Sequence, residues 1–229
     1  MNNTLPAHIA IIPDGNRRWA KQHGFSTLHG HKKGVDVFEN ILTAAFNRGI
    51  KYITFYGFSC ENWNRTKSEV SYLMTLLKWV FAYKMDDFAK RGVQFRAIGR
   101  LDEFSADIRK TVQKAMHVTA AGTKGVVTIA LNYSGRNEIV DMMKKALREK
   151  LDPSKLTEKN VAKLAYAADI PDPDLIIRTS GEERLSGFLL WESAYSELYF
   201  CKKYFPDFTE KDLDKALESY AARQRKFGK

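Results

Sequence analysis

The chain has 229 residues, of which 37 are lysine or arginine and 27 are aspartate or glutamate, so its formal net charge is +10. This length suits one domain with a sizeable core, and the content of 44% hydrophobic and 28% charged residues excludes a disordered chain. No apolar run approaches the roughly 20 residues that cross a bilayer, which excludes a transmembrane protein.

Strand-like and helix-like patterns alternate along the chain. Short continuous apolar runs indicate strands that are covered on both faces, and apolar residues at spacings of three and four indicate helices. In chain order, these patterns predict strand 8–12, helix 35–46, strand 52–58, helix 70–88, strand 93–99, helix 105–121, strand 126–131, helices 136–149 and 158–165, strand 175–177, a weaker strand 197–200 and helix 211–225. Capping-box patterns at Thr66–Glu69 and Thr209–Asp212 mark two helix starts.

This alternation predicts an α/β fold with a mostly parallel central sheet flanked by helices. No linker, repeat or low-complexity segment interrupts it, so a single domain is expected over residues 1–229.

Cysteine content and the N-terminus both favour a cytoplasmic protein. Only Cys60 and Cys201 are present, so a disulfide framework is not expected. Residues 1–6 have neither a basic start nor an apolar stretch, so no signal peptide is expected. The positive charge suits an anionic partner, which could be nucleic acid, a phosphate-bearing substrate or an acidic membrane surface.

Polar residues follow four of the predicted strands, where an open parallel sheet binds its ligands. These segments are Asp14–Trp19, Ser59–Arg65, Asn132–Arg136 and Arg178–Ser186. They are rich in arginine, asparagine and serine, which indicates a site that holds anions.

The segment from Asp14 to Arg18 has two interpretations. Gly15 allows close backbone approach, the helix start offers N–H groups to a phosphate, and Asp14 could bind Mg²⁺. Alternatively, Asp14 and Asn16 simply cap a helix.

The segment from Arg178 to Ser186 also has two interpretations. Arg178, Arg184 and Ser186 suit a diphosphate, but the arginines could instead pair with neighbouring glutamates such as Glu182. Glu197 is either a surface strand residue or a second metal ligand.

Further candidates are individually weak. His31, which opens a predicted helix, could contact phosphate or relay a proton, or it could be a surface or capping histidine. Asn62 can orient a substrate or a water but is no strong base. Cys60 lacks the context of a thiol enzyme and is expected to be inert. Apolar positions at 70–88 either form core or line an apolar tunnel.

Five segments together resemble the cis-prenyltransferases, and within that family the bacterial undecaprenyl diphosphate synthases. They are HIAIIPDGNRRWA, GHKKG, FYGFSCENWNR, NYSGR and IIRTSGEERLSGFLLWESAYSELYF, in the family's order and spacing. The resemblance extends from residue 5 to residue 228. It implies a parallel sheet flanked by helices, an elongated hydrophobic tunnel and a homodimer.

The resemblance also implies an activity. It is the condensation of isopentenyl diphosphate in cis onto an allylic diphosphate, farnesyl diphosphate, with Mg²⁺ as cofactor. The implied product is a long-chain polyprenyl diphosphate such as undecaprenyl diphosphate, the lipid carrier precursor for cell-wall glycan synthesis. A weak peripheral contact with the inner face of the membrane is expected for product release, and no nucleic acid.

Site residues follow from the same resemblance. Asp14 and Asn62 match catalytic residues, and Asp14 and Glu197 match Mg²⁺ contacts. The matched substrate-binding residues are Gly15, Asn16, Arg17, Arg18, Trp19, Thr27 and His31 around the allylic diphosphate, Ser59, Cys60, Glu61, Trp63 and Arg65 beside the substrates, and Arg178, Arg184, Leu185 and Ser186 at the isopentenyl diphosphate.

The chain departs from the family pattern at several positions. Thr27 stands where a basic residue is usual, and Arg17 replaces a glycine. Gly187 and Glu192 replace the usual asparagine and glutamine, and Arg225 is the candidate to reach a partner's active site.

Two other classes of function are less well supported. A nucleic-acid-binding protein would use the +10 charge and exposed aromatic residues, but no nucleic-acid motif is present. A non-catalytic prenyltransferase subunit would typically lack the early aspartate and catalytic-loop residues, whereas Asp14, Asn62, Arg178 and Arg184 are all present.

Overall fold

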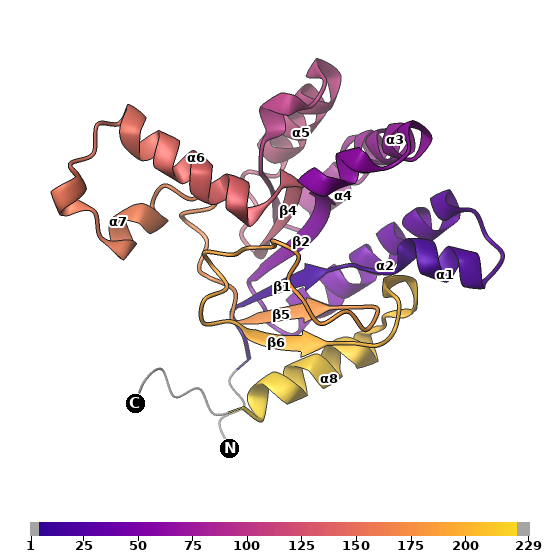
Figure 1. Cartoon of the computed structure of the whole chain (residues 1–229). Coiled ribbons are helices and arrows are strands. Elements are labelled where there is room, and N and C mark those ends of the chain that lie inside the picture. Colours follow the sequence, from indigo (N-terminus) through magenta and orange to yellow (C-terminus); the bar gives the residue numbers. More distant parts are fainter. Residues whose placement is uncertain (1–4, 224–229) are drawn as a thin grey trace.

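Six strands, all parallel, form the central sheet of the computed structural model, which describes residues 5–223 (Figure 1). Their order across the sheet is β3-β4-β2-β1-β5-β6. The strands are β1 (His8–Ile12), β2 (Tyr52–Ser59), β3 (Val93–Ile98), β4 (Gly125–Tyr133), β5 (Leu175–Arg178) and β6 (Glu197–Phe200). All six predicted strands and the α/β fold class are therefore confirmed.

Helices connect the strands. In the described part of the chain, the α-helices are α1 (Asn16–Gln22), α2 (Thr27–Asn47), α3 (Lys67–Tyr83), α4 (Met85–Lys90), α5 (Ala106–Val118), α6 (Gly135–Arg148), α7 (Glu158–Ala162) and α8 (Glu210–Ala221). Thr66 caps α3 by accepting from the backbone N–H of Glu69, and Thr209 forms a capping box with Asp212, as predicted.

Three helix predictions need correction. The helix start that is expected after Gly15 belongs to α1, which is too short to show an apolar period, so the periodicity predicts no helix over its residues. Ser26 caps α2 through the N–H of His29, so this helix starts at Thr27 and His31 lies within it rather than at its start. The pattern at 70–88 divides at Lys84 into α3 and α4. Arg225 lies outside the described residues.

The sheet separates two apolar layers. Ile9 and Ile11 of β1 face the larger one, which α2, α3, α4, α5 and α8 cover. Ala10 and Ile12 face the smaller one, whose other buried members are Ile98, Ala130, Tyr133, Ile176, Phe188 and Leu189. Figure 1 shows α6 and α7 extending to the left as an arm away from this body. Across residues 5–223, no helix combines the length and the apolarity that crossing a bilayer requires.

The topology brings distant segments together at one edge of the sheet. Strand β1 lies between β2 and β5, with Ile12 beside Arg178 in the register. Because all strands run the same way, the residues that follow Ile12, Ser59 and Arg178 emerge at the same edge.

Candidate active site

The backbone of Asp14 is fixed by the end of β5. Its N–H donates to Thr179 Oγ1 at 2.9 Å, and Thr179 Oγ1 donates back to the Asp14 carbonyl oxygen at 2.7 Å. The N–H of Phe205 donates to the same carbonyl at 3.0 Å. The carboxylate of Asp14 is therefore held at a set position beside the strand ends.

Gly15 is required by its backbone conformation and by its neighbours. Its φ of 102° lies in the left-handed region, and a Cβ there would stand 2.6 Å from Tyr204 Cδ1 and 3.0 Å from Ser180 Cβ. No side chain caps the helix α1 that follows, so its first N–H groups lack the partner that a capping residue would supply. The capping interpretation of Asp14 and Asn16 is therefore wrong, and the cradle interpretation fits.

Two arginines surround the Asp14 carboxylate. Arg178 donates from Nη2 to Oδ2 at 2.8 Å, and Arg18 Nη2 lies 3.3 Å from Oδ1. Burial alone would raise the pKa of Asp14, but the Arg178 hydrogen bond and the charges of Arg178 and Arg18 outweigh it, so the net pKa is lowered. Asp14 is consequently ionised at neutral pH.

Arg178 is the most enclosed cation of the site, with only 5% of its side chain exposed. It donates to Ser186 Oγ at 2.8 Å and to the backbone carbonyl of Arg184. Its Nε is buried without a hydrogen-bond partner. Because the guanidinium is fixed by a carboxylate, a hydroxyl and a carbonyl, its positive charge is held at a set position beside Asp14.

Arg18 and Arg184 are held by Glu182. Arg18 Nη1 donates to Glu182 Oε1 at 2.6 Å, Arg184 Nη1 donates to Oε2 at 2.5 Å, and both hydrogen bonds lower the pKa of Glu182. Arg18 also donates to Ser180 Oγ at 2.6 Å and lies over the Tyr204 ring. Of the ion pairs considered from the sequence, the one between Arg184 and Glu182 exists, whereas Arg178 pairs with Asp14 instead. Glu182 positions Arg18 and Arg184 at the pocket.

Two arginines and a histidine surround Glu69. Arg65 lies 2.8 Å, Arg17 3.5 Å and His31 3.4 Å from its carboxylate oxygens. Burial would raise the pKa of Glu69, but the charges of Arg65 and Arg17 and the hydrogen bonds from Arg65 and His31 lower it. Burial and the Arg65 charge lower the pKa of His31, which keeps its imidazole neutral at pH 7.

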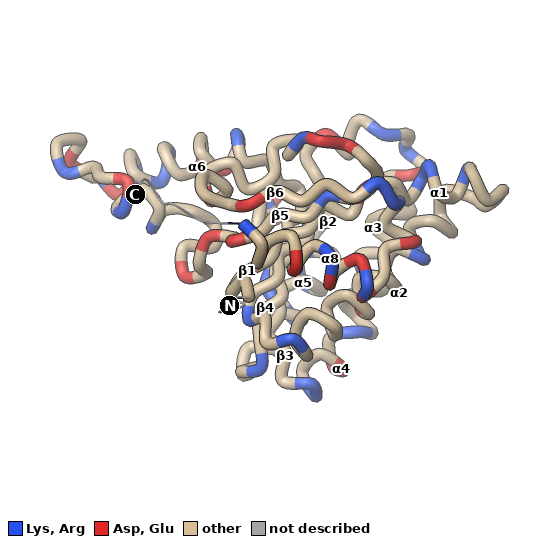
Figure 2. The backbone as a smooth tube through the Cα atoms, turned by 90° about the horizontal axis from the view of Figure 1, so that it is seen from below, with Lys and Arg blue, Asp and Glu red and all other residues tan. Residues whose placement is uncertain are grey.

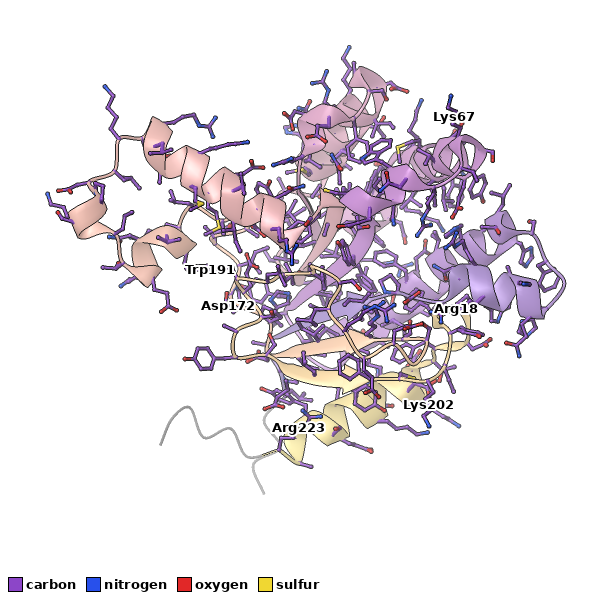
Figure 3. All side chains as sticks on the ribbon, viewed as in Figure 1. Arg18, Lys67, Asp172, Trp191, Lys202 and Arg223 are labelled. Atoms are coloured by element: carbon purple, nitrogen blue, oxygen red, sulfur yellow. The ribbon has the colours of Figure 1, made fainter. Side chains whose placement is uncertain are left out.

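Several of these side chains line a polar pocket of about 310 Å³, whereas Arg178 and Ser186 lie outside its lining. Its lining residues are Pro13, Asp14, Gly15, Asn16, Arg17, Arg18, His31, Arg65 and Arg184. Figure 3 shows Arg18 at this end of the sheet. The pocket is a cationic cavity with one carboxylate.

An apolar pocket of about 140 Å³ adjoins the polar one between α2, α3 and the sheet. Pro13, Asn16 and His31 line both, so the two are contiguous. Its walls include Phe38 of α2 and Leu76 of α3. Part of the 70–88 stripe therefore lines a cavity rather than solid core.

The predicted segment after β2 forms a short 3₁₀ turn, Cys60–Asn64, outside the lining of the polar pocket. Asn62 Oδ1 accepts from the Ser59 N–H at 3.1 Å and closes this turn. Burial raises the pKa of Cys60, which agrees with an inert thiol. Glu61 is exposed.

Trp63 of the same turn is tied to the sheet rather than to the pocket. Its Nε1 donates to Asn132 Oδ1 at 2.8 Å, and the Asn132 amide donates in turn to the carbonyl of Arg100 at 3.0 Å. The turn is thereby anchored between β2 and β4.

Three other predicted residues support the site without lining the polar pocket. Trp19 is buried and donates from Nε1 to Asp207 Oδ1 at 2.7 Å. Thr27 is the first residue of α2. Leu185 packs against the smaller apolar layer.

Glu197 does not join Asp14 in one chain. It begins β6 beside Leu175, at the opposite end of β5 from Arg178, and its carboxylate pairs with Arg223 at 2.5 Å. Figure 3 shows Arg223 well separated from Arg18. The expectation that Glu197 and Asp14 contact the same ion is therefore wrong within a single chain.

The residues of the polar pocket fit Mg²⁺ only if substrate phosphates and water supply further ligands. Across residues 5–223, no cluster of three or more His, Cys, Asp or Glu residues could hold a metal ion. Asp14 is the one acidic residue in the lining of the polar pocket. Mg²⁺ typically uses one or two carboxylates together with substrate phosphates and water. A cationic pocket with a single ionised carboxylate is consistent with that preference.

The sequence does not predict several residues of the site. Glu69 is predicted only as part of a capping box, yet its carboxylate contacts three residues that line the polar pocket. Thr179 and Tyr204 fix the Asp14–Gly15 backbone. The pairings of Glu69 with Arg17 and His31, and of Asp14 with Thr179, join residues far apart in sequence, so no local pattern marks them.

Comparisons with known proteins agree with this arrangement. A family model described as "Putative undecaprenyl diphosphate synthase" matches residues 12–228. Isoprenyl transferase of Thermotoga maritima is 45% identical over 226 residues, covering 98% of this chain and 97% of its own, and isoprenyl transferase of Aquifex pyrophilus is 42% identical over 229 residues, covering 100% and 98%.

Two solved structures share the fold over nearly the whole chain. One is lavandulyl diphosphate synthase from Lavandula x intermedia in complex with dimethylallyl diphosphate, with a TM-score of 0.94, 34% identity and coverage of 98% and 99% of the two chains. The other is a probable undecaprenyl diphosphate synthase from Campylobacter jejuni, with a TM-score of 0.84, 30% identity and full coverage of both chains. The chain therefore belongs to the undecaprenyl diphosphate synthase family and is a cis-prenyltransferase enzyme.

Proposed function

We propose that this enzyme condenses isopentenyl diphosphate units in cis onto farnesyl diphosphate to make undecaprenyl diphosphate, the lipid carrier precursor for cell-wall glycan synthesis. The observation that carries the proposal is the continuity of the two pockets through Pro13, Asn16 and His31. An allylic diphosphate has a doubly charged head and an apolar tail, and this pair of cavities matches both.

The head of the allylic substrate would lie among the cations of the polar pocket. Arg18, Arg17 and Arg65 line it, together with the glycine-led start of α1. Such donors stabilise the negative charge that develops as the diphosphate departs. Asp14 and the substrate phosphates would hold Mg²⁺, which supplies further neutralisation of that charge.

The second diphosphate, that of isopentenyl diphosphate, is assigned to the Arg178–Ser186 corner. Arg178 already binds Ser186 and the Arg184 carbonyl, so the corner is preformed. Arg184 lines the polar pocket from this side. Holding two diphosphates at a fixed separation contributes through proximity, up to roughly 7–11 kcal/mol in well-oriented systems.

The reaction balances without a redox partner. The allylic C–O bond breaks with its electron pair on the departing diphosphate, and the isopentenyl double bond forms the new C–C bond. A proton then leaves to regenerate a double bond. Asn62, whose carboxamide oxygen already accepts from Ser59, orients groups rather than accepting that proton. The neutral imidazole of His31, a water or the departing diphosphate receives it.

Two features of the assembly belong to the proposal. The apolar pocket continues as the elongated tunnel that houses the growing chain, each methylene gaining about 0.8 kcal/mol on burial. The protein acts as a homodimer on the cytoplasmic side of the membrane.

Substitution of Asp14 tests the proposal. Asp14→Asn keeps an acceptor for Arg178 but removes the charge, so turnover of farnesyl and isopentenyl diphosphates should fall by a factor of about 100–1,000. Turnover is measured by incorporation of radiolabelled isopentenyl diphosphate, and folding by circular dichroism.

The matched control is Asp169→Asn, which removes an aspartate that pairs with Arg96 on the surface. It should leave turnover unchanged. Near-normal turnover of the folded Asp14→Asn variant would overturn the assignment.

A further inference from the structure

The hairpin of α1 and α2 has an unusual charge composition. Residues 16–35 contain the lysines and arginines Arg17, Arg18, Lys21, Lys32 and Lys33, and no aspartate or glutamate. Figure 1 shows this hairpin projecting at the right edge of the molecule, and in Figure 2 the tube of α1 carries blue segments only. The hairpin is thus a local excess of positive charge at a projecting position.

The turn of this hairpin also exposes large apolar side chains. Phe25 is 48% and Leu28 40% exposed. Phe25 is held in place by a stack of rings: it lies 4.3 Å from His29 and 5.7 Å from Trp19, centroid to centroid, with small interplanar angles. Trp19 is itself buried, so the exposed ring has a rigid base. Such a side chain loses little conformational freedom when a partner covers it.

The other end of the same hairpin forms the active site. Arg17 and Arg18 of α1 and His31 of α2 line the polar pocket. The helix α3 is tied to the turn as well, because the Tyr72 hydroxyl donates to the Leu28 carbonyl at 3.2 Å. A partner that covers the turn would therefore lie within one short helix of the site from which the product leaves.

We infer that the hairpin tip, defined as Lys21, Phe25, Leu28 and Lys32, docks the enzyme on a lipid bilayer that contains anionic lipids. Phe25 and Leu28 enter the boundary between headgroups and acyl chains, and the lysines meet the negative surface potential. The absence of acidic residues from 16–35 matches a negatively charged surface.

This inference deepens the proposed function, and it rests on it for its purpose, since a polyprenyl diphosphate has to enter a membrane. Docking requires both the apolar side chains and the lysines of the hairpin tip, because a few apolar side chains or a few charges alone give only marginal binding. The docked enzyme would release its product where the hydrocarbon tail meets lipid rather than water.

Vesicle sedimentation without any substrate tests the docking separately from the chemistry. The full-length protein should bind vesicles of phosphatidylcholine with phosphatidylglycerol far more tightly than vesicles of phosphatidylcholine alone. Raising the salt concentration should weaken this binding, because screening shortens the reach of the surface potential.

Two variants locate the binding surface. Lys21→Ser/Lys32→Ser should weaken binding to anionic vesicles by about 25-fold, about five-fold for each lysine. Phe25→Ser/Leu28→Ser should weaken it by about ten-fold or more. The matched control Lys110→Ser/Lys114→Ser removes two exposed lysines of α5 and should bind like the unmodified protein.

Three outcomes would overturn the inference. The protein could bind neither vesicle, which would leave the tip as a surface for an acidic protein. It could bind both vesicles equally, or the tip variants could bind as the unmodified protein does. Condensation of farnesyl and isopentenyl diphosphates is assayed in parallel without lipid, so loss of the activity and loss of docking are read independently.

Discussion

Two partly buried carboxyl groups of this chain have opposite pKa shifts. Burial acts on Asp14 and on Glu192 in the same direction, because it disfavours the charged form. At Asp14 two arginines outweigh it and lower the pKa. At Glu192 the neighbouring charge is that of Glu138, and burial and this carboxylate together raise the pKa to about 8. The charge of the neighbouring groups, rather than the extent of burial, therefore decides which of the two carboxyl groups is ionised at neutral pH.

The carboxyl groups of Glu192 and Glu138 lie close enough for Glu138 to raise the pKa of Glu192. Glu138 is fully buried and accepts hydrogen bonds from the Tyr133 hydroxyl and the Tyr166 N–H, while Glu192 Oε2 has no partner. The other charged groups that act on the pair are Asp141 and Asp172, both negative.

This pair predicts a pH dependence of stability. The folded state holds the Glu192 proton up to about pH 8, whereas the unfolded state releases it near its ordinary value of 4.5. The stability from this group is therefore complete below about pH 4.5 and is lost as the pH rises through 8. Glu192→Gln keeps a hydrogen-bond donor without a titrating proton. It should raise the melting temperature above pH 8 by at least about 2–4 °C, equivalent to about 1 kcal/mol.

Thermal unfolding from pH 6 to pH 9 measures this effect. The difference between the variant and the unmodified protein should widen as the pH rises. A constant or shrinking difference would contradict the raised pKa of Glu192.

The sequence predicts correctly that Asp14 and Arg178 lie at the same edge of the sheet. Asp14 and Arg178 meet because β1 and β5 are neighbours and run in parallel. Glu197 begins β6, as the predicted strand 197–200 already implies, so parallel pairing with β5 places it at the opposite edge of the sheet from Arg178 within one chain. The roles of Glu69 and Glu192 depend on side-chain pairings between distant segments, which no local pattern in one sequence reveals.

At the scale of elements, the helix α3 serves as both scaffold and cavity wall. Thr66 caps its start, which places Glu69 in the first turn among Arg17, His31 and Arg65. Further along, Leu76 lines the apolar pocket. Its sequence predicted an apolar stripe correctly, but not the break at Lys84 or the cavity, because periodicity reports which face is apolar and not what fills the space beside it.

Filling the apolar pocket should shorten the product. Leu76→Trp adds a ring to a cavity of about 140 Å³, so chains should end after fewer isopentenyl additions while the first addition persists. Thin-layer chromatography of the dephosphorylated products measures the length distribution. Thr75→Trp, on the exposed side of the same helix, is the control and should leave the distribution unchanged.

At the scale of the whole molecule, the projecting arm carries an unpartnered apolar stripe. Val140, Met143 and Leu147 follow one another at helical spacing on α6, and Met143 is 63% and Leu147 79% exposed. Side chains of this kind gathered on one helix face mark an interaction surface. We assign this stripe to the proposed homodimer.

Charge on the stripe should separate the subunits. Met143→Asp/Leu147→Asp places two carboxylates on the face that a second copy would cover, and each would be desolvated on assembly. Light scattering coupled to size-exclusion chromatography should show about half the mass of the unmodified protein. An unchanged mass would place the interface elsewhere, and Lys110→Asp/Lys114→Asp on α5 controls for added charge.

We propose, above all, that the polar and apolar pockets act as one site for an allylic diphosphate and its growing chain. The most direct measurement is incubation of the purified protein with farnesyl diphosphate, radiolabelled isopentenyl diphosphate and Mg²⁺, followed by separation of the extracted products by length. The products should be a labelled series extended by several five-carbon units with new cis double bonds, and this series should disappear when Mg²⁺ is chelated. A correctly folded protein that incorporates no label, or that yields only trans double bonds, would contradict this proposal.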